Sequence, residues 1–368
     1  MESSNRARTT SRLYLTAPRR LAWITEELPP LGPHDVLVQT STGAISIGSE
    51  LPLYRGNSRA SRLPHYPRSV GYESVGIVVA CGSAVQRVKR GERVVAFYGH
   101  HTYAVVPETQ VIVVPDGVSD ALAILSILTC DTAKGVRKIA PRPEEIALIT
   151  GAGVIGLLTL FILRAYGVVQ VDVVEPLAER HALARLLGAQ HVWRSQDMPS
   201  ESRKYAVAFE CSSRNEAFAL LQKQVQYHGR ICITADGNIE PLVLTPDFHE
   251  KELHIVGSSD GWDYHTHAAW YFRHVQQYAT CLEQLFELRV ARAELISTFE
   301  QLAQLQDPQT DRRSSLVAQQ SLPTSSLDQQ EEYNKKKQNM SSDFALGEIH
   351  PLKVLVSYEN AMNPTEAC

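Results

Sequence analysis

Residues 145–156 read EIALITGAGVIG, an apolar run that leads into the glycine pattern Gly151-Ala152-Gly153-Val154-Ile155-Gly156. The apolar run predicts a buried strand, and the apolar residues after the glycines predict a helix. A strand, a glycine turn and a helix in this order indicate a dinucleotide site, because the helix N-terminus offers N–H groups and a positive dipole end to phosphates. Gly151 permits the tight turn, Gly153 the approach of a pyrophosphate and Gly156 close packing of helix on strand.

The segments after this motif repeat the alternation of strand and helix. VQVDVVEP (169–176) predicts a strand, AERHALARLLGA (178–189) a helix and HVWR (191–194) a third strand. Further strands are predicted in YAVAFECSS, GRICITADG and ELHIVGSS. This β-α-β-α-β series predicts an α/β fold with a doubly wound parallel sheet of the Rossmann type.

An acidic residue ends the second predicted strand. Glu175 lies about 20 residues after the glycine turn, where a carboxylate accepts hydrogen bonds from the adenosine ribose of NAD. The same carboxylate repels the 2′-phosphate of NADP by about 1 kcal/mol or more, so NAD is the predicted cofactor. Arg180 leaves an alternative open, since its guanidinium can reach a ribose hydroxyl or a phosphate, or simply be solvated on a helix surface.

The chain on either side of this region has a different character. HDVLVQTSTGAISIG, VGYESVGIVVACG and GERVVAFYGHHTYAVVPETQVIVVP contain short Val, Ile, Tyr and Thr runs between Gly and Pro, which predict a twisted sheet or small barrel. Residues 301–330 are rich in Gln, Ser, Asp and Pro, which favours a solvated, disordered insertion. HPLKVLVSYE then resumes strand character, so we expect the C-terminal segment to return to the first domain.

Composition excludes several classes of partner. The 368 residues are 44% hydrophobic and 21% charged, enough for a large core in two domains. A net charge of −4 with scattered basic residues gives no footprint for nucleic acid or anionic lipid. No apolar run approaches the ~18 residues of a membrane span and no signal-peptide core is present, so the expected location is cytoplasmic.

The cysteines are too scattered for a disulfide framework or zinc ribbon; they are Cys81, Cys130, Cys211, Cys232, Cys281 and Cys368.

Eight short motifs occur in a fixed order along the chain: GSELPLYRG, GYESVG, GERV, AVVP, TAKG, GAGVIG, VVEP and LKVLV. In this order they resemble the medium-chain dehydrogenase/reductase superfamily, which includes alcohol, polyol and threonine dehydrogenases and quinone reductases. The resemblance covers residues of about 12–300 and 345–358 and implies a β-rich catalytic domain of GroES-like fold before the Rossmann domain. We therefore expect four parts: catalytic domain 1–125, Rossmann domain 126–300, polar insertion 301–342 and a return segment 343–368.

The metal ligands of the superfamily are missing from the matching positions. Ile47 replaces the usual Cys, Pro52 the usual His, Tyr72 the second His, and Leu128 falls at the third ligand position. Because catalytic zinc needs three N, S or O protein ligands, we expect no metal. I-S-x-G-S-E followed by G-Y-E resembles, among zinc-independent branches, bacteriochlorophyllide a dehydrogenase and its relatives, which oxidise a secondary alcohol with NAD.

The resemblance also implies the site residues. Ser49 matches the hydroxyl that bonds the substrate oxygen and passes its proton on, and Tyr72 either donates to that oxygen or fills the vacated metal pocket. Glu50 and Glu73 are candidate orienting groups or bases, or structural acceptors. Thr132, Ser212 and Ala235 match family positions beside the cofactor. His100 and His101 are adjacent on a strand, so at most one is expected to face the substrate.

A polar and aromatic cluster in SSDGWDYHTH remains outside these motifs. Asp260, Tyr264, His265 and His267 form a candidate substrate or subunit contact, and the alternating histidines lack a third metal ligand at usable spacing.

The leading hypothesis is an NAD-dependent dehydrogenase of a secondary alcohol, acting on a polyol, sugar derivative or natural-product hydroxyl, or the reverse ketone reduction. The alternatives are a zinc-free quinone or enoyl reductase and a non-catalytic dinucleotide-binding protein. A homodimer or homotetramer is expected from the resemblance alone.

Overall fold

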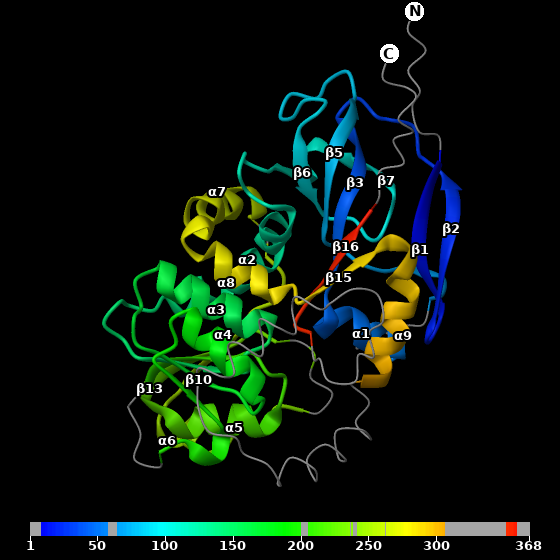
Figure 1. Cartoon of the computed structure of the whole chain (residues 1–368). Helices are drawn as coiled ribbons and strands as arrows, with labels where there is room; N and C mark the ends of the chain where they lie inside the picture. Colours follow the sequence, from blue (N-terminus) through cyan, green and yellow to red (C-terminus); the bar gives the residue numbers. More distant parts are fainter. Residues whose placement is uncertain are drawn as a thin grey trace, which may run out of the picture.

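The computed structural model describes residues 9–57, 65–199, 205–235, 237, 241–261, 263–305 and 351–358. It has three sheets, of which two large ones organise the two domains seen in Figure 1. No helix in the described ranges is both long enough and apolar enough to cross a membrane.

The Rossmann sheet has six parallel strands in the order β11-β10-β9-β12-β13-β14. This order reverses direction beside β9, the strand that leads into the glycine turn, and ligands of such sheets bind at that reversal. The strands are β9 (Ala147–Thr150), β10 (Val171–Val174), β11 (His191–Trp193), β12 (Tyr205–Glu210), β13 (Val225–Ile233) and β14 (His254–Gly257).

Helices cover both faces of this sheet, as the alternating sequence predicts (Figure 1). The apolar side chains of α2, α3, α4 and α7 join one face in the largest core cluster, and α5 joins a separate cluster on the other. The helices are α2 (Asp120–Ile139), α3 (Val154–Ala165), α4 (His181–Leu186), α5 (Asn215–Gln224), α6 (Pro246–Glu250), α7 (Tyr264–His274) and α8 (Ala279–Leu282).

The catalytic domain is built on a seven-stranded sheet in the order β15-β16-β3-β5-β6-β8, with β7 also paired to β3. A three-stranded sheet, β2-β1-β4, lies beside it. The strands are β1 (Thr9–Ala17), β2 (Arg20–Glu27), β3 (Asp35–Ile45), β4 (Arg68–Ser69), β5 (Ser74–Cys81), β6 (Arg93–Ala96), β7 (Tyr103–Pro107), β8 (Val111–Val113), β15 (Leu288–Ala291) and β16 (Val354–Ser357).

Two elements beyond the Rossmann sheet complete this domain. The predicted return of the C-terminal segment is β16, which pairs antiparallel with β3 and parallel with β15. Helix α9 (Leu295–Leu305) packs with α1 (Ile47–Arg55) through an apolar cluster that includes Leu51 and Phe299. The chain therefore rejoins the catalytic sheet at Leu288, before the expected boundary at residue 300, and residues 301–305 are helical because they bury Leu302. The rest of the expected insertion lies outside the described residues.

Candidate functional site

The glycine turn has the geometry expected for close approach of a phosphate. Gly151 adopts a φ of +88°, and a Cβ on Gly156 would lie 1.8 Å from the carbonyl oxygen of Gly151. Gly153 is the N-cap of α3, and a Cβ there would meet no atom within 4 Å. In the described part of the chain no side chain caps this N-terminus. Its N–H groups, together with Val154 and Ile155 in the first turn, fit the pyrophosphate of a dinucleotide.

Glu175 is buried under the same turn. Its Oε2 accepts the N–H of Ala152 at 2.6 Å and its Oε1 accepts the N–H of Leu177 at 2.9 Å. Arg180 lies 3.9 Å from Oε2, and its Nε is buried without a partner in the described structure. A carboxylate can accept further hydrogen bonds beside these. The carboxylate thus ties the glycine turn to the end of β10, where the adenosine ribose is expected.

The other candidate cofactor residues lie around this edge. Ser212 packs against Gly151, where an added Cβ would lie 3.2 Å from the Ser212 Cβ. Ser212 also donates its N–H and its hydroxyl to the buried carboxylate of Glu210. Ala235 follows β13 and donates its N–H to the carbonyl of Glu210. Thr132 is buried in α2 and donates its hydroxyl to the carbonyl of Leu128, so its side chain supports the helix.

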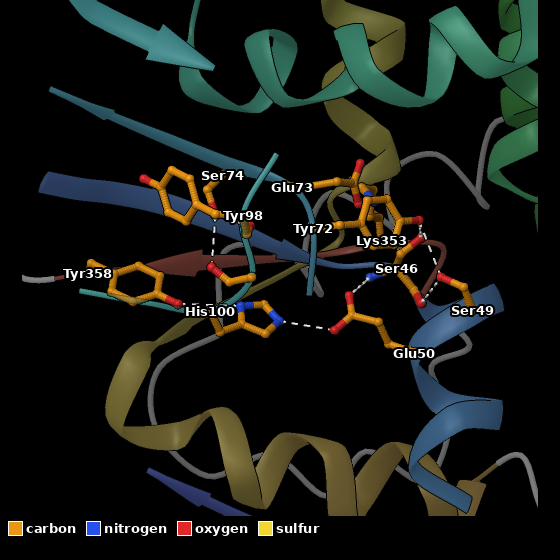
Figure 2. A network of polar contacts seen from close by, with 11 residues as sticks. Ser46, Ser49, Glu50, Tyr72, Glu73, Ser74, Tyr98, His100, Lys353 and Tyr358 are labelled. Atoms are coloured by element: carbon orange, nitrogen blue, oxygen red, sulfur yellow. Dashed lines mark hydrogen bonds and ion pairs between the residues drawn. The ribbon is translucent and has the colours of Figure 1, made fainter. Parts of the chain in front are cut away.

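Three hydroxyl groups meet at the N-terminus of α1 (Figure 2). Tyr72 donates to Ser46 Oγ at 2.7 Å, and its oxygen lies 3.3 Å from Ser49 Oγ. Ser49 is exposed, whereas Tyr72 is partly buried. Burial, and after it the charge of Glu73, raises the pKa of Tyr72 well above its ordinary value. The phenol is therefore neutral at physiological pH and can donate a hydrogen bond.

The same helix end faces the Rossmann domain. A Cβ on Gly237, in the segment after β13, would lie 3.2 Å from Ser213 Oγ and 3.9 Å from the carbonyl oxygen of Gly48. Gly48 precedes Ser49 and is itself exposed. The hydroxyl cluster of Ser46, Ser49 and Tyr72 thus lies where the first turn of α1 approaches the Rossmann loops.

Behind the hydroxyl cluster, Glu50 and His100 are both buried. Glu50 accepts the N–H of Ser46 at 2.8 Å with Oε1 and lies 3.1 Å from His100 Nε2 with Oε2. His101 turns the other way, toward Tyr98, with ring centroids 5.7 Å apart. Glu50 and His100 are 3% and 1% exposed. They are placed to orient α1.

A buried ion pair lies beside Tyr72. Lys353, immediately before β16, and Glu73 are both fully buried, and Lys353 Nζ donates to Glu73 Oε2. Oε1 of Glu73 has no partner in the described structure, and Figure 2 shows the carboxyl group turned toward the helices of the other domain. Burial raises the pKa of Glu73 to about 7 although the ammonium of Lys353 opposes that rise.

The side chains at the family's metal positions do not fit zinc. Ile47 and Leu128 are buried hydrocarbons, Glu73 is already paired with an ammonium group, and Glu50 is bonded to Ser46 and His100. Burial raises the pKa of the Cys130 thiol to about 12, which disfavours the thiolate that zinc binds. Within the described ranges no three His, Cys, Asp or Glu side chains gather in a metal-binding group.

The cluster in SSDGWDYHTH is divided by the fold. His265 Nε2 lies 2.8 Å from the carbonyl of Thr109, whereas His267 is buried against Thr129 Oγ1 at 3.0 Å. Tyr264 donates to Asp131 at 2.7 Å. The backbone carbonyl of Asp260 accepts a hydrogen bond from Lys134 Nζ at 2.8 Å. The two histidines therefore serve different local contacts.

Sequence reasoning missed Ser46 and Lys353. Ser46 is the first serine of the matched I-S-x-G-S-E motif but was given no role, because its partner Tyr72 is 26 positions away. Lys353 lies in the matched LKVLV segment, but its pairing with Glu73 spans 280 positions. A lone lysine inside an apolar strand segment was the available signal, because Lys is seldom buried unless paired.

The comparisons agree with this two-domain geometry. Residues 32–116 match the model of the alcohol dehydrogenase GroES-like domain, and residues 154–271 match the zinc-binding dehydrogenase model. L-idonate 5-dehydrogenase of Vitis vinifera is 25% identical over 273 residues, which are 62% of this chain and 74% of that protein.

Solved structures share the fold. Acetophenone reductase from Geotrichum candidum, in complex with NAD, gives a TM-score of 0.69 at 20% identity and covers 83% of this chain and 96% of its own. S. aureus TarJ, in complex with NADPH, gives a TM-score of 0.67 at 15% identity, and the match covers 95% of this chain and 99% of the TarJ chain.

The fold, the glycine turn and the matched domains define a nicotinamide-dependent oxidoreductase of the class that acts on CH–OH groups. More particularly, the two matched domain models place the chain in the medium-chain dehydrogenase/reductase superfamily.

Proposed function

We propose that this protein is an NAD-dependent, zinc-independent dehydrogenase that oxidises a secondary alcohol to a ketone, or catalyses the reverse reduction. The observation that carries the proposal is the cluster of Ser46, Ser49 and Tyr72 hydroxyls at the end of α1 that approaches the Rossmann loops. Polyols, sugar derivatives and natural-product hydroxyls form the substrate class, in keeping with a relative named for L-idonate.

Alcohol oxidation requires a donor to the developing alkoxide and a route for the hydroxyl proton. Tyr72 is the donor, because its raised pKa keeps the phenol protonated. Its single proton points to Ser46 Oγ in the structure and turns to the substrate oxygen when the alcohol binds. Ser49 is exposed at the cluster, so its hydroxyl can take the substrate proton while giving its own proton to solvent water. NAD, when bound to the turn at Gly151–Gly156, supplies the hydride acceptor.

The preference for NAD rests on Glu175. Its carboxylate is fixed at the end of β10 by two backbone N–H groups, so a negative charge stands where a 2′-phosphate would come. Arg180 beside it offsets part of this repulsion, and we expect a preference for NAD rather than complete exclusion of NADP.

The test combines binding, metal content and turnover on the purified protein. NADH and NADPH are titrated by fluorescence, bound metals are counted by mass spectrometry, and secondary alcohols and ketones are screened by NADH absorbance with and without chelator. We expect micromolar NADH binding, substoichiometric zinc and chelator-resistant turnover.

The possible results separate the hypotheses. Zinc at one per chain that is lost together with activity overturns zinc independence. Reduction of quinones or enones without alcohol turnover favours the reductase alternative, and nucleotide binding without any turnover favours a binding protein. Light scattering on the same sample tests the expected homodimer or homotetramer.

A further inference from the structure

His100 lies between the two segments that carry the hydroxyl cluster. It is 1% exposed, in the stretch between β6 and β7. Its Nε2 lies 3.1 Å from Glu50 Oε2 and its Nδ1 lies 3.4 Å from the hydroxyl of Tyr358. The ring is thus held between a carboxylate and a phenol, each within hydrogen-bonding distance of one ring nitrogen.

His100 is linked to Ser49 through Glu50, which holds the first turn of α1. The other oxygen of Glu50 accepts the N–H of Ser46, the N-cap of α1, and the Ser46 side chain makes no cap of its own. Helix α1 has nine residues and contains Gly48 and Pro52, both poor helix formers. The first turn, which carries Ser49, therefore depends on the Glu50 carboxylate, and His100 fixes that carboxylate.

His100 is linked to Tyr72 through the backbone. Gly71 has a φ of +82°, and a Cβ on it would lie 2.7 Å from Cδ2 of His100. The backbone at Gly71, directly before Tyr72, thus lies so close to the imidazole that a side chain would not fit between them. The buried ring of His100 therefore contacts both chain segments that carry the reacting hydroxyls, that of Ser49 and that of Tyr72, although these two residues are 23 positions apart.

We propose that His100 is a positioning residue of the reaction site, which holds Ser49 and Tyr72 in one frame through Glu50 and Gly71. The role rests on the proposed function. His100 does not touch the substrate; its effect on the reaction is geometric. A shift of about 1 Å in either hydroxyl is enough to cost roughly 10²-fold in rate.

The test compares His100→Leu and His100→Gln with His101→Leu. Leu is close to His in volume and removes both ring nitrogens, whereas Gln keeps an N–H donor that can reach Glu50. His101 is the matched control, because it is the neighbouring buried histidine and faces Tyr98 instead of Glu50. Hydrogen–deuterium exchange of peptides from α1 and from α3 is measured together with kcat, KM and NADH affinity.

For His100→Leu we expect exchange in the first turn of α1 to rise about tenfold or more, with α3 unchanged. We expect kcat to fall roughly 10²-fold with NADH affinity unchanged, recovery of most of both effects in His100→Gln, and parental α1 exchange in His101→Leu. If His100→Leu does not fold, Tyr358→Phe removes only the partner of Nδ1 and should raise α1 exchange in the same direction.

Unchanged α1 exchange in the His100 variants, or equal effects of His101→Leu, overturns the positioning role. So does a glutamine variant no better than leucine. The exchange measurement needs no substrate, so it decides the role of His100 even if the parent protein oxidises no alcohol. Failure of the proposed function is then seen separately, as absence of turnover in the parent.

Discussion

Replacing Lys353 by Met should destabilise the protein in a pH-dependent way. The lysine and Glu73 are both 0% exposed and paired with each other. Removing one partner of a buried ion pair typically costs about 3–5 kcal/mol, because the other charge is left uncompensated. We expect a loss of this size in the free energy of unfolding at pH 8, where Glu73 is ionised in the parent. In the variant no ammonium lowers its pKa, so the carboxyl group must stay uncompensated or take up a proton.

The pH dependence follows from the pKa of Glu73, which is raised from 4.5 to about 7 in the folded protein. A raised pKa means that the stability contributed by Glu73 is fully present below pH 4.5 and is lost as the pH rises through about 7. This difference corresponds to about 3 kcal/mol. At pH 6 the carboxyl group is largely protonated and needs no counterion, so the cost of Lys353→Met should shrink.

Urea unfolding of the parent and the variant at pH 6 and pH 8 measures both quantities. The matched control is the double variant Glu73→Gln with Lys353→Met, which removes both charges and should recover most of the stability, as neutral replacements of buried pairs often do. A cost below about 1 kcal/mol at pH 8, or the same cost at both pH values, would refute this reasoning.

Three further predictions concern the two halves of the site. Tyr72→Phe keeps the ring but removes the hydroxyl donor, so the rate of single-turnover hydride transfer should fall about 10²-fold. If this variant and Ser49→Ala both stay within about threefold of the parent rate, a barrier change of less than about 1 kcal/mol, neither hydroxyl is catalytic. Glu175→Ala should weaken NADH binding and reduce discrimination against NADPH, measured by titration; a parent that binds NADPH at least about tenfold tighter contradicts the assigned role. Gly156→Ala places a Cβ 1.8 Å from a carbonyl oxygen, so dinucleotide binding should be lost while the catalytic domain retains its proteolytic resistance.

The Rossmann half could be predicted closely from sequence because its signals are local. Strand, glycine turn and helix follow one another within a few residues, and their repetition predicts a doubly wound parallel sheet. The strand order β11-β10-β9-β12-β13-β14 is known from the structure.

The catalytic half depends on contacts between distant parts of the chain. Its strands were recognisable by composition, but nothing local shows that β15 and α9 leave the Rossmann region to join β16 and α1. The partners of the site residues were hidden for the same reason: Glu50 was a candidate, yet its bond to His100 crosses 50 positions. Motif matching located the hydroxyls, whereas the groups that hold them are visible only in three dimensions.

The position of β16 has a consequence for how the protein is made. This strand lies between β3 and β15, yet it is separated from β3 by the whole Rossmann domain. During synthesis the Rossmann sheet can close while β3 still presents a row of unsatisfied N–H and C=O groups. The nascent chain should therefore need protection by chaperones over this interval, and a ribosome that stalls ahead of Lys353 would release a molecule able to bind a dinucleotide but unable to assemble its reaction site.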